Sequence, residues 1–206
     1  MPLPMFPLGT VLVPGMVLPL HVFEQRYRRL VRDCLAGAAE LGVVLIRRGS
    51  EVGGGDVRTD VGTLARIGRA DEQPDGRWFL VAVGERRIRV ARWLEDDPYP
   101  RAEVVEWPDD PATAPHEAAQ VIARIEVQLR RAAALLVELG EPAPPVGLSL
   151  AAEPVAASYQ AVALGPLGPA DRHHLLAAPT VAERFEGLAT RLADAIELLQ
   201  ARIAMG

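Results

Sequence analysis

The sequence predicts an α+β protein in which a small, mostly antiparallel β-barrel with one packed helix is followed by an α-helical bundle. Three observations support this fold class. Short β-type segments separated by turns fill the first half, apolar residues recur with a helical period after residue 110, and half of the 206 residues are apolar. We therefore expect two domains, residues 1–110 and residues 111–206.

The amino-terminal segment, residues 1–23, contains no charged side chain but five prolines. Each proline removes a backbone donor and disfavours a helix, so short extended pieces joined by kinks are expected here. From Glu24 onward, charged residues separate apolar residues that recur at spacings of three and four, which predicts an amphipathic helix lying over the extended segment. Its apolar stripe consists of Phe23, Tyr27, Leu30, Val31 and Cys34.

Several strands are predicted between the first helix and residue 107. Residues 41–47 form a β-branched run, and residues 50–60, with three consecutive glycines, are expected to form a surface loop. Turns are predicted at 74–76, where Asp-Gly accepts a positive φ, and at 84–85. The remaining predicted strands are residues 61–69, 78–83, 86–93 and 101–107. Sequential strands with tight turns indicate an antiparallel meander that curls into a barrel.

The second half is predicted to be helical. Residues 109–115, DDPATAP, form the domain boundary, where Asp109 and Asp110 are interpreted as a solvated loop. Helices are then expected at 116–139, 154–164 and 170–177, and Thr180 with Glu183 makes a capping box that opens a last helix. The continuous apolar stripe of this last helix suits a homodimer.

The opening segment also carries a family resemblance. FPLGTVLVPGMVLPLHVFEQRYRRLVRDCL resembles the start of the amino-terminal substrate-binding domain of Lon, the ATP-dependent protease. Phe23, Glu24, Arg26 and Tyr27 match its first helix start, whereas Gln25 stands where proline is expected. The resemblance implies a PUA-like barrel followed by a helical bundle. It further implies a stand-alone, substrate-binding member without ATPase and protease modules.

No catalytic constellation is found in the sequence. All 22 basic residues are arginine, which excludes a P-loop lysine, a Ser-Lys dyad and a Schiff base. No serine lies in a Gly-x-Ser-x-Gly elbow, and Cys34 is interpreted as a core residue. The four histidines, His21, His116, His173 and His174, lack metal-chelating spacing. We therefore predict a non-enzyme with no catalytic residue, no metal and no cofactor.

Two binding functions follow from the same residues. A polypeptide-binding surface needs exposed large apolar side chains, for which Phe6, Met16, Trp78 and Trp107 are the candidates, with burial in the core as the alternative for each. Its partners would be polypeptide substrates and a separate ATP-dependent protease. The second hypothesis is an RNA-binding module using Arg87, Arg89 and Trp93, which share a strand face. The net charge of −5 disfavours nucleic acid.

The cellular location is expected to be the cytoplasm. A single cysteine fits a reducing compartment, and the uncharged amino terminus lacks the basic region of a signal peptide. Its prolines would also leave too many backbone groups unsatisfied in lipid, so no membrane association is expected.

Overall fold

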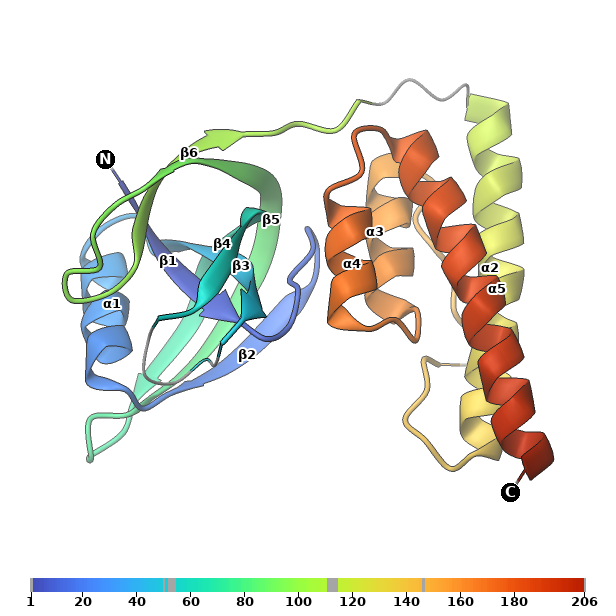
Figure 1. Ribbon diagram of the computed structural model, residues 1–206, viewed down its shortest axis with the longest axis horizontal. Helices are drawn as coiled ribbons and strands as arrows, with labels where there is room; N and C mark the ends of the chain where they lie inside the picture. The colour runs from blue at the N-terminus through green and yellow to red at the C-terminus, as the bar shows by residue number, and fades with distance from the viewer. Residues whose placement is uncertain (1, 50, 52–54, 111–114, 146, 206) are drawn as a thin grey trace. The chain divides into compact units, whose positions relative to one another are not determined.

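A computed structural model describes residues 2–49, 51, 55–110, 115–145 and 147–205, and within these ranges the chain forms six strands and five helices. The fold is α+β, as predicted. Two compact units can be distinguished, Met1–Pro108 and Asp109–Gly206. The first contains all six strands and one helix, and the second contains four helices (Figure 1).

The first unit is built on one six-stranded sheet. Its strands are β1 (Leu3–Leu8), β2 (Val17–Val22), β3 (Glu40–Arg48), β4 (Val57–Glu72), β5 (Trp78–Trp93) and β6 (Arg101–Glu106). The strand order is β2-β5-β4-β3-β1-β6, and β6 also pairs with β5. Five strands therefore form a closed ring, and β2 lies outside it, paired with the first half of β5. All pairs are antiparallel except β1 with β3.

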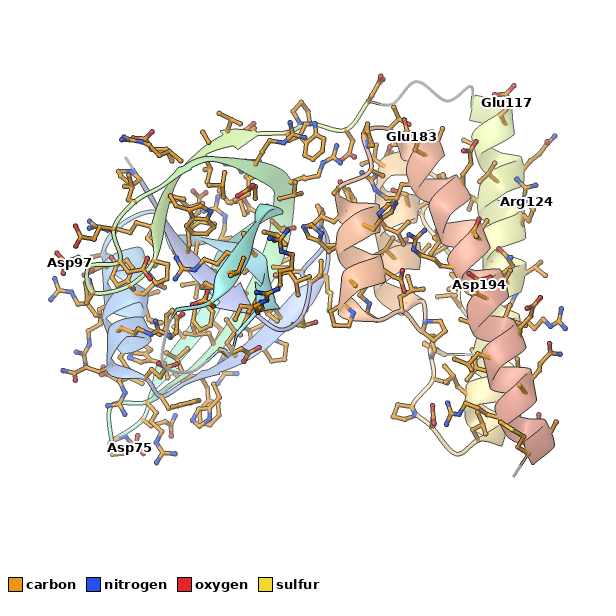
Figure 2. The ribbon with its side chains drawn as sticks, in the orientation of Figure 1. Asp75, Asp97, Glu117, Arg124, Glu183 and Asp194 are labelled. Carbon is orange, nitrogen blue, oxygen red and sulfur yellow. The ribbon has the colours of Figure 1, made fainter. Side chains whose placement is uncertain are left out.

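Strand β5 differs from its prediction. A turn was expected at residues 84–85, but residues 78–93 form one continuous strand. The reason is that Gly84 provides close approach instead of a turn. A Cβ on this residue would lie 2.5 Å from the carbonyl oxygen of Val13 and 3.1 Å from Cγ2 of Thr63. The expected turn at residues 74–76 is present, with Gly76 at φ 79° and the Asp75 side chain at the hairpin tip (Figure 2).

Strand β4 is longer than predicted, because it begins at Val57 and includes four residues of the expected loop 50–60. The rest of that loop lies partly outside the described residues, which omit 50 and 52–54. Residues 111–114 of the expected boundary, and the side chain of His116, also lie outside them.

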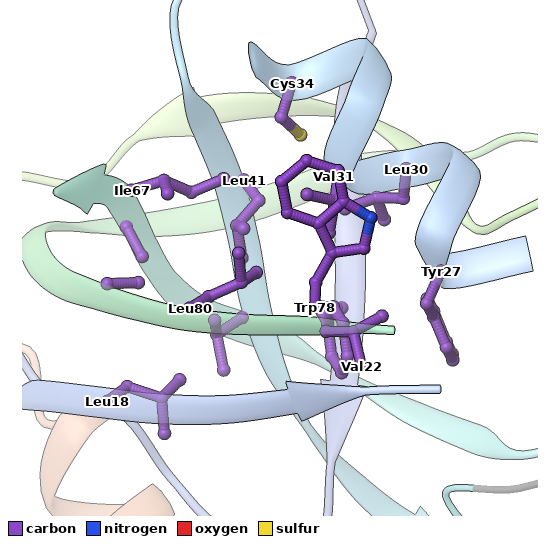
Figure 3. Packing of buried hydrophobic residues seen from close by; sticks show 14 of the residues in the cluster. Leu18, Val22, Tyr27, Leu30, Val31, Cys34, Leu41, Ile67, Trp78 and Leu80 are labelled. Atoms are coloured by element: carbon purple, nitrogen blue, oxygen red, sulfur yellow. The ribbon is translucent and has the colours of Figure 1, made fainter. Parts of the chain in front are cut away.

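Helix α1 (Gln25–Ala36) covers the core of the first unit with the predicted stripe. Tyr27, Leu30, Val31 and Cys34 are buried among residues of β2, β3, β4 and β5 (Figure 3). Fully burying a side chain of this kind contributes about 1.5–3 kcal/mol. Phe23 was expected in the same stripe, but it precedes the helix and 48% of its surface is exposed.

The second unit consists of α2 (Pro115–Glu138), α3 (Pro154–Leu164), α4 (Pro169–Leu176) and α5 (Val181–Met205). Helices α2 and α5 lie side by side (Figure 1), and a shared cluster contains Ala132, Leu136, Ile196 and Leu199. Thr180 caps α5 by accepting a hydrogen bond from the Glu183 amide at 3.1 Å, as the capping box predicts.

A buried arginine connects three segments of the second unit. Arg184 has no exposed surface, donates to Leu175 O and Ser158 Oγ at 3.0 Å, and forms an ion pair with Asp109. Its guanidinium lies 4.1 Å from the ring of Tyr159, whose hydroxyl donates to Asp109 Oδ2 at 2.6 Å. The interpretation of Asp109 as a solvated loop residue was therefore wrong, because two partners distant in sequence bind both carboxylate oxygens.

No helix in the described part of the chain is long and apolar enough to cross a membrane.

Candidate functional site: an exposed apolar face on two strands

An exposed apolar surface lies on the outer side of β2 and the first half of β5. Side chains alternate between the two faces of a strand, so every second residue of each strand points outward. Val17 is paired with Val83, Pro19 with Val81, and His21 with Phe79. We call this surface, with Phe23 at its end, the β2–β5 apolar face. Its residues are Val17, Pro19, His21, Phe23, Phe79, Val81 and Val83.

The aromatic residues of this face are held together by contact. The rings of His21 and Phe79 are stacked, with centroids 4.5 Å apart and planes 9° apart. The centroid of the Phe23 ring lies 6.1 Å from that of the His21 ring. Phe23 is 48% exposed and Phe79 is 49% exposed. Two half-exposed phenylalanines beside three exposed valines form a contiguous patch of the kind that marks interaction sites.

The remaining outer surface of the sheet is charged, in contrast to this face. Arg66 on β4 contacts Glu85 at 2.5 Å and Glu40 at 2.7 Å, and Arg92 on β5 contacts Glu103 at 2.6 Å. Strand β2, VLPLHV, contains no acidic residue and no arginine or lysine. The apolar face is therefore a local feature of β2 and of the part of β5 that pairs with it.

A small cavity lies beside β2. It has a volume of about 170 Å³, and its lining is mostly apolar but includes two glutamates. The lining residues are Phe6, Leu8, Pro19, Leu20, His21, Val22, Phe23, Glu24, Tyr27 and Glu51. The rings of Phe6 and Tyr27 stack with centroids 4.4 Å apart. Burial raises the pKa of the Tyr27 hydroxyl to about 12, so it stays neutral at physiological pH. The cavity is thus a recess next to the apolar face that is apolar along β1 and β2 and has the carboxylates of Glu24 and Glu51 in its lining.

A broader hollow of about 880 Å³ lies over α1, where Arg26, Arg28, Arg29 and Arg32 contribute to its lining. Arg29 pairs with Asp33 at 2.9 Å and Arg32 with Glu72 at 2.7 Å. Carboxylates therefore already neutralise part of this arginine surface, and it is a weaker candidate than the apolar face.

The four residues predicted to bind polypeptide do not form one surface. Phe6 and Trp78 are buried in the core of the first unit, so the core interpretation applies to them. Met16 is half-buried and packs against the same core. Trp107 is half-buried, with its ring 4.0 Å from the guanidinium of Arg87 and 3.7 Å from that of Arg89.

The residues of the RNA hypothesis are only partly brought together. Arg87 is 2% exposed and donates from Nε to the carbonyl oxygen of Trp107 at 3.1 Å, whereas Arg89 is exposed. Trp93 lies instead near Arg58, whose guanidinium is 5.0 Å from its ring. Both stacking partners of Trp107 and the ring of Trp93 are thus engaged within the protein.

The sequence reasoning missed Val17, Phe79, Val81 and Val83, although a signal for them was present. In FLVAV, residues 79–83, small and large apolar residues fill both faces of the strand, so one set must point away from the core. Which set is exposed depends on the pairing of β5 with β2 and on the side of the sheet that α1 covers. The sequence of residues 79–83 alone does not specify either.

Cys34 and Ser158, which were considered as nucleophiles, are both buried. Burial raises the pKa of the Cys34 thiol to about 12, which disfavours a thiolate nucleophile. Ser158 is buried and donates to the carbonyl oxygen of Val155 at 2.7 Å. Within the described ranges, no group of three or more His, Cys, Asp or Glu side chains is arranged to hold a metal ion.

Comparison with known proteins identifies the class. The family model of the ATP-dependent protease La (LON) substrate-binding domain matches residues 2–194, so the chain belongs to this family. The resemblance noted in the opening segment is thereby confirmed, and the match extends over both units.

Individual relatives give the same result. The chain is 34% identical over 106 residues to the Lon protease of Flavobacterium johnsoniae and 37% identical over 105 residues to Lon protease 2 of Myxococcus xanthus. Each match covers 50% of this chain and 13% of the relative, so the matched region is a small part of those proteases.

Two solved structures are similar along nearly the whole chain. The Lon N-terminal domain protein from Xanthomonas campestris is 29% identical, with a TM-score of 0.67, and the match covers 92% of this chain and 98% of that one. The N-terminal domain of the Mycobacterium avium complex Lon protease has a TM-score of 0.63 at 21% identity, covering 94% and 99%, which shows a shared fold.

Proposed function

We propose that this protein is a non-catalytic polypeptide-binding domain that holds extended, apolar segments of other chains on the β2–β5 apolar face. The observation that carries the proposal is the contiguous exposure, between 36% and 54% each, of apolar residues on two paired strands and directly after the first of them. These residues are Val17, Phe23, Phe79, Val81 and Val83. Membership of a substrate-binding family supports it.

The physical basis of binding is the removal of apolar surface from water. Each Å² buried contributes about 25 cal/mol, so covering a few hundred Å² stabilises a complex by several kcal/mol before ordering costs are subtracted. We therefore expect weak affinity, of the order of micromolar, with little dependence on the exact client sequence. Such binding suits the recognition of unfolded or hydrophobic segments for proteolysis.

Two finer expectations belong to the same proposal. The closed ring of five strands would correspond to a PUA-like β-barrel, and the bound polypeptides would be clients of an ATP-dependent protease with which this domain works. Similarity to the Lon proteases of Flavobacterium johnsoniae and Myxococcus xanthus supports the association with proteolysis.

The test is binding of a permanently unfolded probe, reduced and carboxymethylated α-lactalbumin, measured by fluorescence anisotropy. Replacing Phe79→Ser together with Val81→Thr should weaken binding about tenfold or more, because both apolar side chains leave the face. The matched control is Val105→Ser, which removes an exposed valine of β6 outside the face. Equal binding by the double variant and the wild type would contradict the proposal.

The RNA-binding hypothesis has less support, because Arg87 is buried and the ring of Trp93 is already in contact with Arg58. It predicts a shift of single-stranded RNA in a low-salt gel that disappears in Arg87→Ala/Arg89→Ala. A salt-sensitive shift lost in that variant, together with no binding of the unfolded probe, would favour RNA over polypeptide.

A further inference from the structure

Strand β2 presents a free edge. Its partner among the described strands is β5 alone, and it stands at the end of the strand order. Proteins commonly protect such edges with charged side chains, because unpaired backbone groups attract other strands. Strand β2 contains no Asp, Glu, Lys or Arg. Pro19 is the only residue of β2 of a type that commonly protects an edge strand.

The hydrogen bonds at the start of the β2–β5 pair indicate which backbone groups face the free edge. The amide of Gly84 donates to the carbonyl oxygen of Met16 at 3.0 Å. Bonded and non-bonded pairs alternate along antiparallel strands, so the even-numbered residues of β2 face β5. The backbone groups of Val17, Pro19 and His21 then face outward. Pro19 thus occupies a position where its missing N–H removes no bond to β5.

The open edge therefore offers a defined set of partners. It has two N–H donors, from Val17 and His21, and three carbonyl acceptors, from Val17, Pro19 and His21. A polypeptide pairing with this edge would form its bonds through every second residue.

An added strand would also place its side chains on two apolar surfaces. One alternate set would continue the β2–β5 apolar face beside Pro19 and His21. The other set would point to the side of Leu20 and Val22, two of the β2 residues that line the cavity of about 170 Å³. Strand β2 contributes no Asp, Glu, Lys or Arg to either surface, and Glu24 and Glu51 of the cavity lining lie outside the strand. A segment with apolar residues in both sets therefore fits best along β2.

We infer that polypeptide clients bind by strand addition to the free edge of β2, as extended segments that are apolar on both faces. This inference rests on the proposed function and specifies its geometry. Backbone pairing supplies affinity that does not depend on the client's sequence, and the two apolar surfaces select β-forming segments over charged ones.

The test uses the acetylated and amidated peptide Lys-Val-Ala-Val-Ala-Val-Lys, which is apolar on both faces between its lysines, and two derivatives that are N-methylated on alternate sets of residues, the valines or the alanines. N-methylation removes backbone donors and keeps the side chains. If the peptide pairs with one edge, one derivative should lose about tenfold or more in affinity and the other should bind within about threefold of the parent. Calorimetric titration of the full chain measures all three.

The outcomes separate this inference from the proposed function. Equal binding by all three peptides would overturn strand addition and leave binding by the apolar face intact. Failure of the parent peptide and of the unfolded probe alike would overturn both. A last outcome concerns self-association. If the wild type is a dimer that the peptide does not disrupt, and the Val17 variants are monomers, then the edge binds a second copy of the chain. That result would overturn the inference.

A pair of protein variants tests the edge from the other side. Val17→Pro removes an outward N–H donor, whereas Val17→Thr keeps that donor and the β-branched shape. We expect Val17→Pro to weaken binding of the parent peptide about tenfold and Val17→Thr to change it by less than about threefold. If both variants unfold at the same temperature as the wild type, a difference in peptide affinity is due to the backbone donor at the edge and not to a loss of folding. Equal affinities for the two folded variants would contradict strand addition.

Discussion

The ring of His21 on β2 stacks on the ring of Phe79 on β5, with centroids 4.5 Å apart and planes 9° apart, on the outside of the sheet. Stacked aromatic pairs usually lie in a protein core, where burial stabilises them. Here the contact holds two flat aromatic side chains at the surface. It thereby gives the β2–β5 apolar face a defined shape before any ligand arrives.

Replacement of Gly84 should destabilise the first unit. In Gly84→Ala the new Cβ would lie 2.5 Å from Val13 O, so the backbone must shift, and we expect a loss of about 1–3 kcal/mol. Urea unfolding followed by tryptophan fluorescence measures it. Gly68→Ala is the matched control, because there the nearest atom, Val81 O, is 3.7 Å away. Similar unfolding midpoints for the two variants would contradict close approach as the role of Gly84.

Removal of Arg184 should destabilise the second unit strongly. Arg184→Met leaves the half-buried Asp109 carboxylate without its cation, and we expect a loss of about 3–5 kcal/mol. The double variant Arg184→Met/Asp109→Leu should recover part of this loss, because no unpaired charge then remains. Arg202→Met, which breaks the exposed pair with Glu141, should change the unfolding midpoint little. If the stability losses of the two single replacements simply add up in the double variant, the two residues do not act as a pair.

Cys34 should be unreactive in the folded protein. Burial raises the pKa of its thiol to about 12, so the thiolate that reacts with iodoacetamide is scarce at pH values near 8. Relative to an exposed thiol, alkylation should be slower by roughly a thousandfold, and mass spectrometry over time measures it. Urea should restore the ordinary rate. Rapid labelling without denaturant would mean that the helix α1 core opens readily.

Acid should destabilise the first unit in part through Asp56. Burial alone would raise the pKa of this carboxyl, but hydrogen bonds from Arg58 outweigh it, and the net pKa lies below the ordinary value. The folded form then binds its proton less readily than the unfolded form. The contribution is complete above the unfolded pKa of about 3.9 and is lost as pH falls through the folded value.

The Asp56→Asn variant should therefore show a shallower decline of the urea midpoint between neutral and acidic pH than the wild type. Asp75→Asn, at the exposed tip of the β4–β5 hairpin, serves as the control and should follow the wild-type profile. If Asp56→Asn declines as steeply as the wild type, other carboxylates cause the acid sensitivity.

Local sequence patterns predicted most helices and strands, because their signals act over a few residues. The stripe of α1 was confirmed from Tyr27 to Cys34 but not at Phe23. The capping box at Thr180 and Glu183 was confirmed, and α3 begins and ends at the predicted residues 154 and 164. The prediction at Gly84 was wrong, because a glycine serves a turn or a close approach equally well and only the neighbouring chain distinguishes them. Val13, which excludes a Cβ there, is 71 residues away in sequence.

The candidate site was less accessible to sequence reasoning. Trp78 was predicted to bind polypeptide because it is large and apolar, but the fold buries its side chain under α1. Phe79, the next residue, is exposed. Strand alternation separates the two residues, yet it does not say which face is covered. The family resemblance, by contrast, was carried by contiguous residues near the amino terminus and was confirmed by the match to residues 2–194.

By itself, the sequence determined the α+β class, the change from strands to helices, the family and the absence of lysine chemistry, because these follow from composition and from patterns short enough to act locally. Only the tertiary structure decided that β2 stands at the end of the sheet, that its outer side is apolar and exposed, and that Arg184 binds Asp109. These features depend on contacts between residues far apart in the chain, which no local pattern specifies.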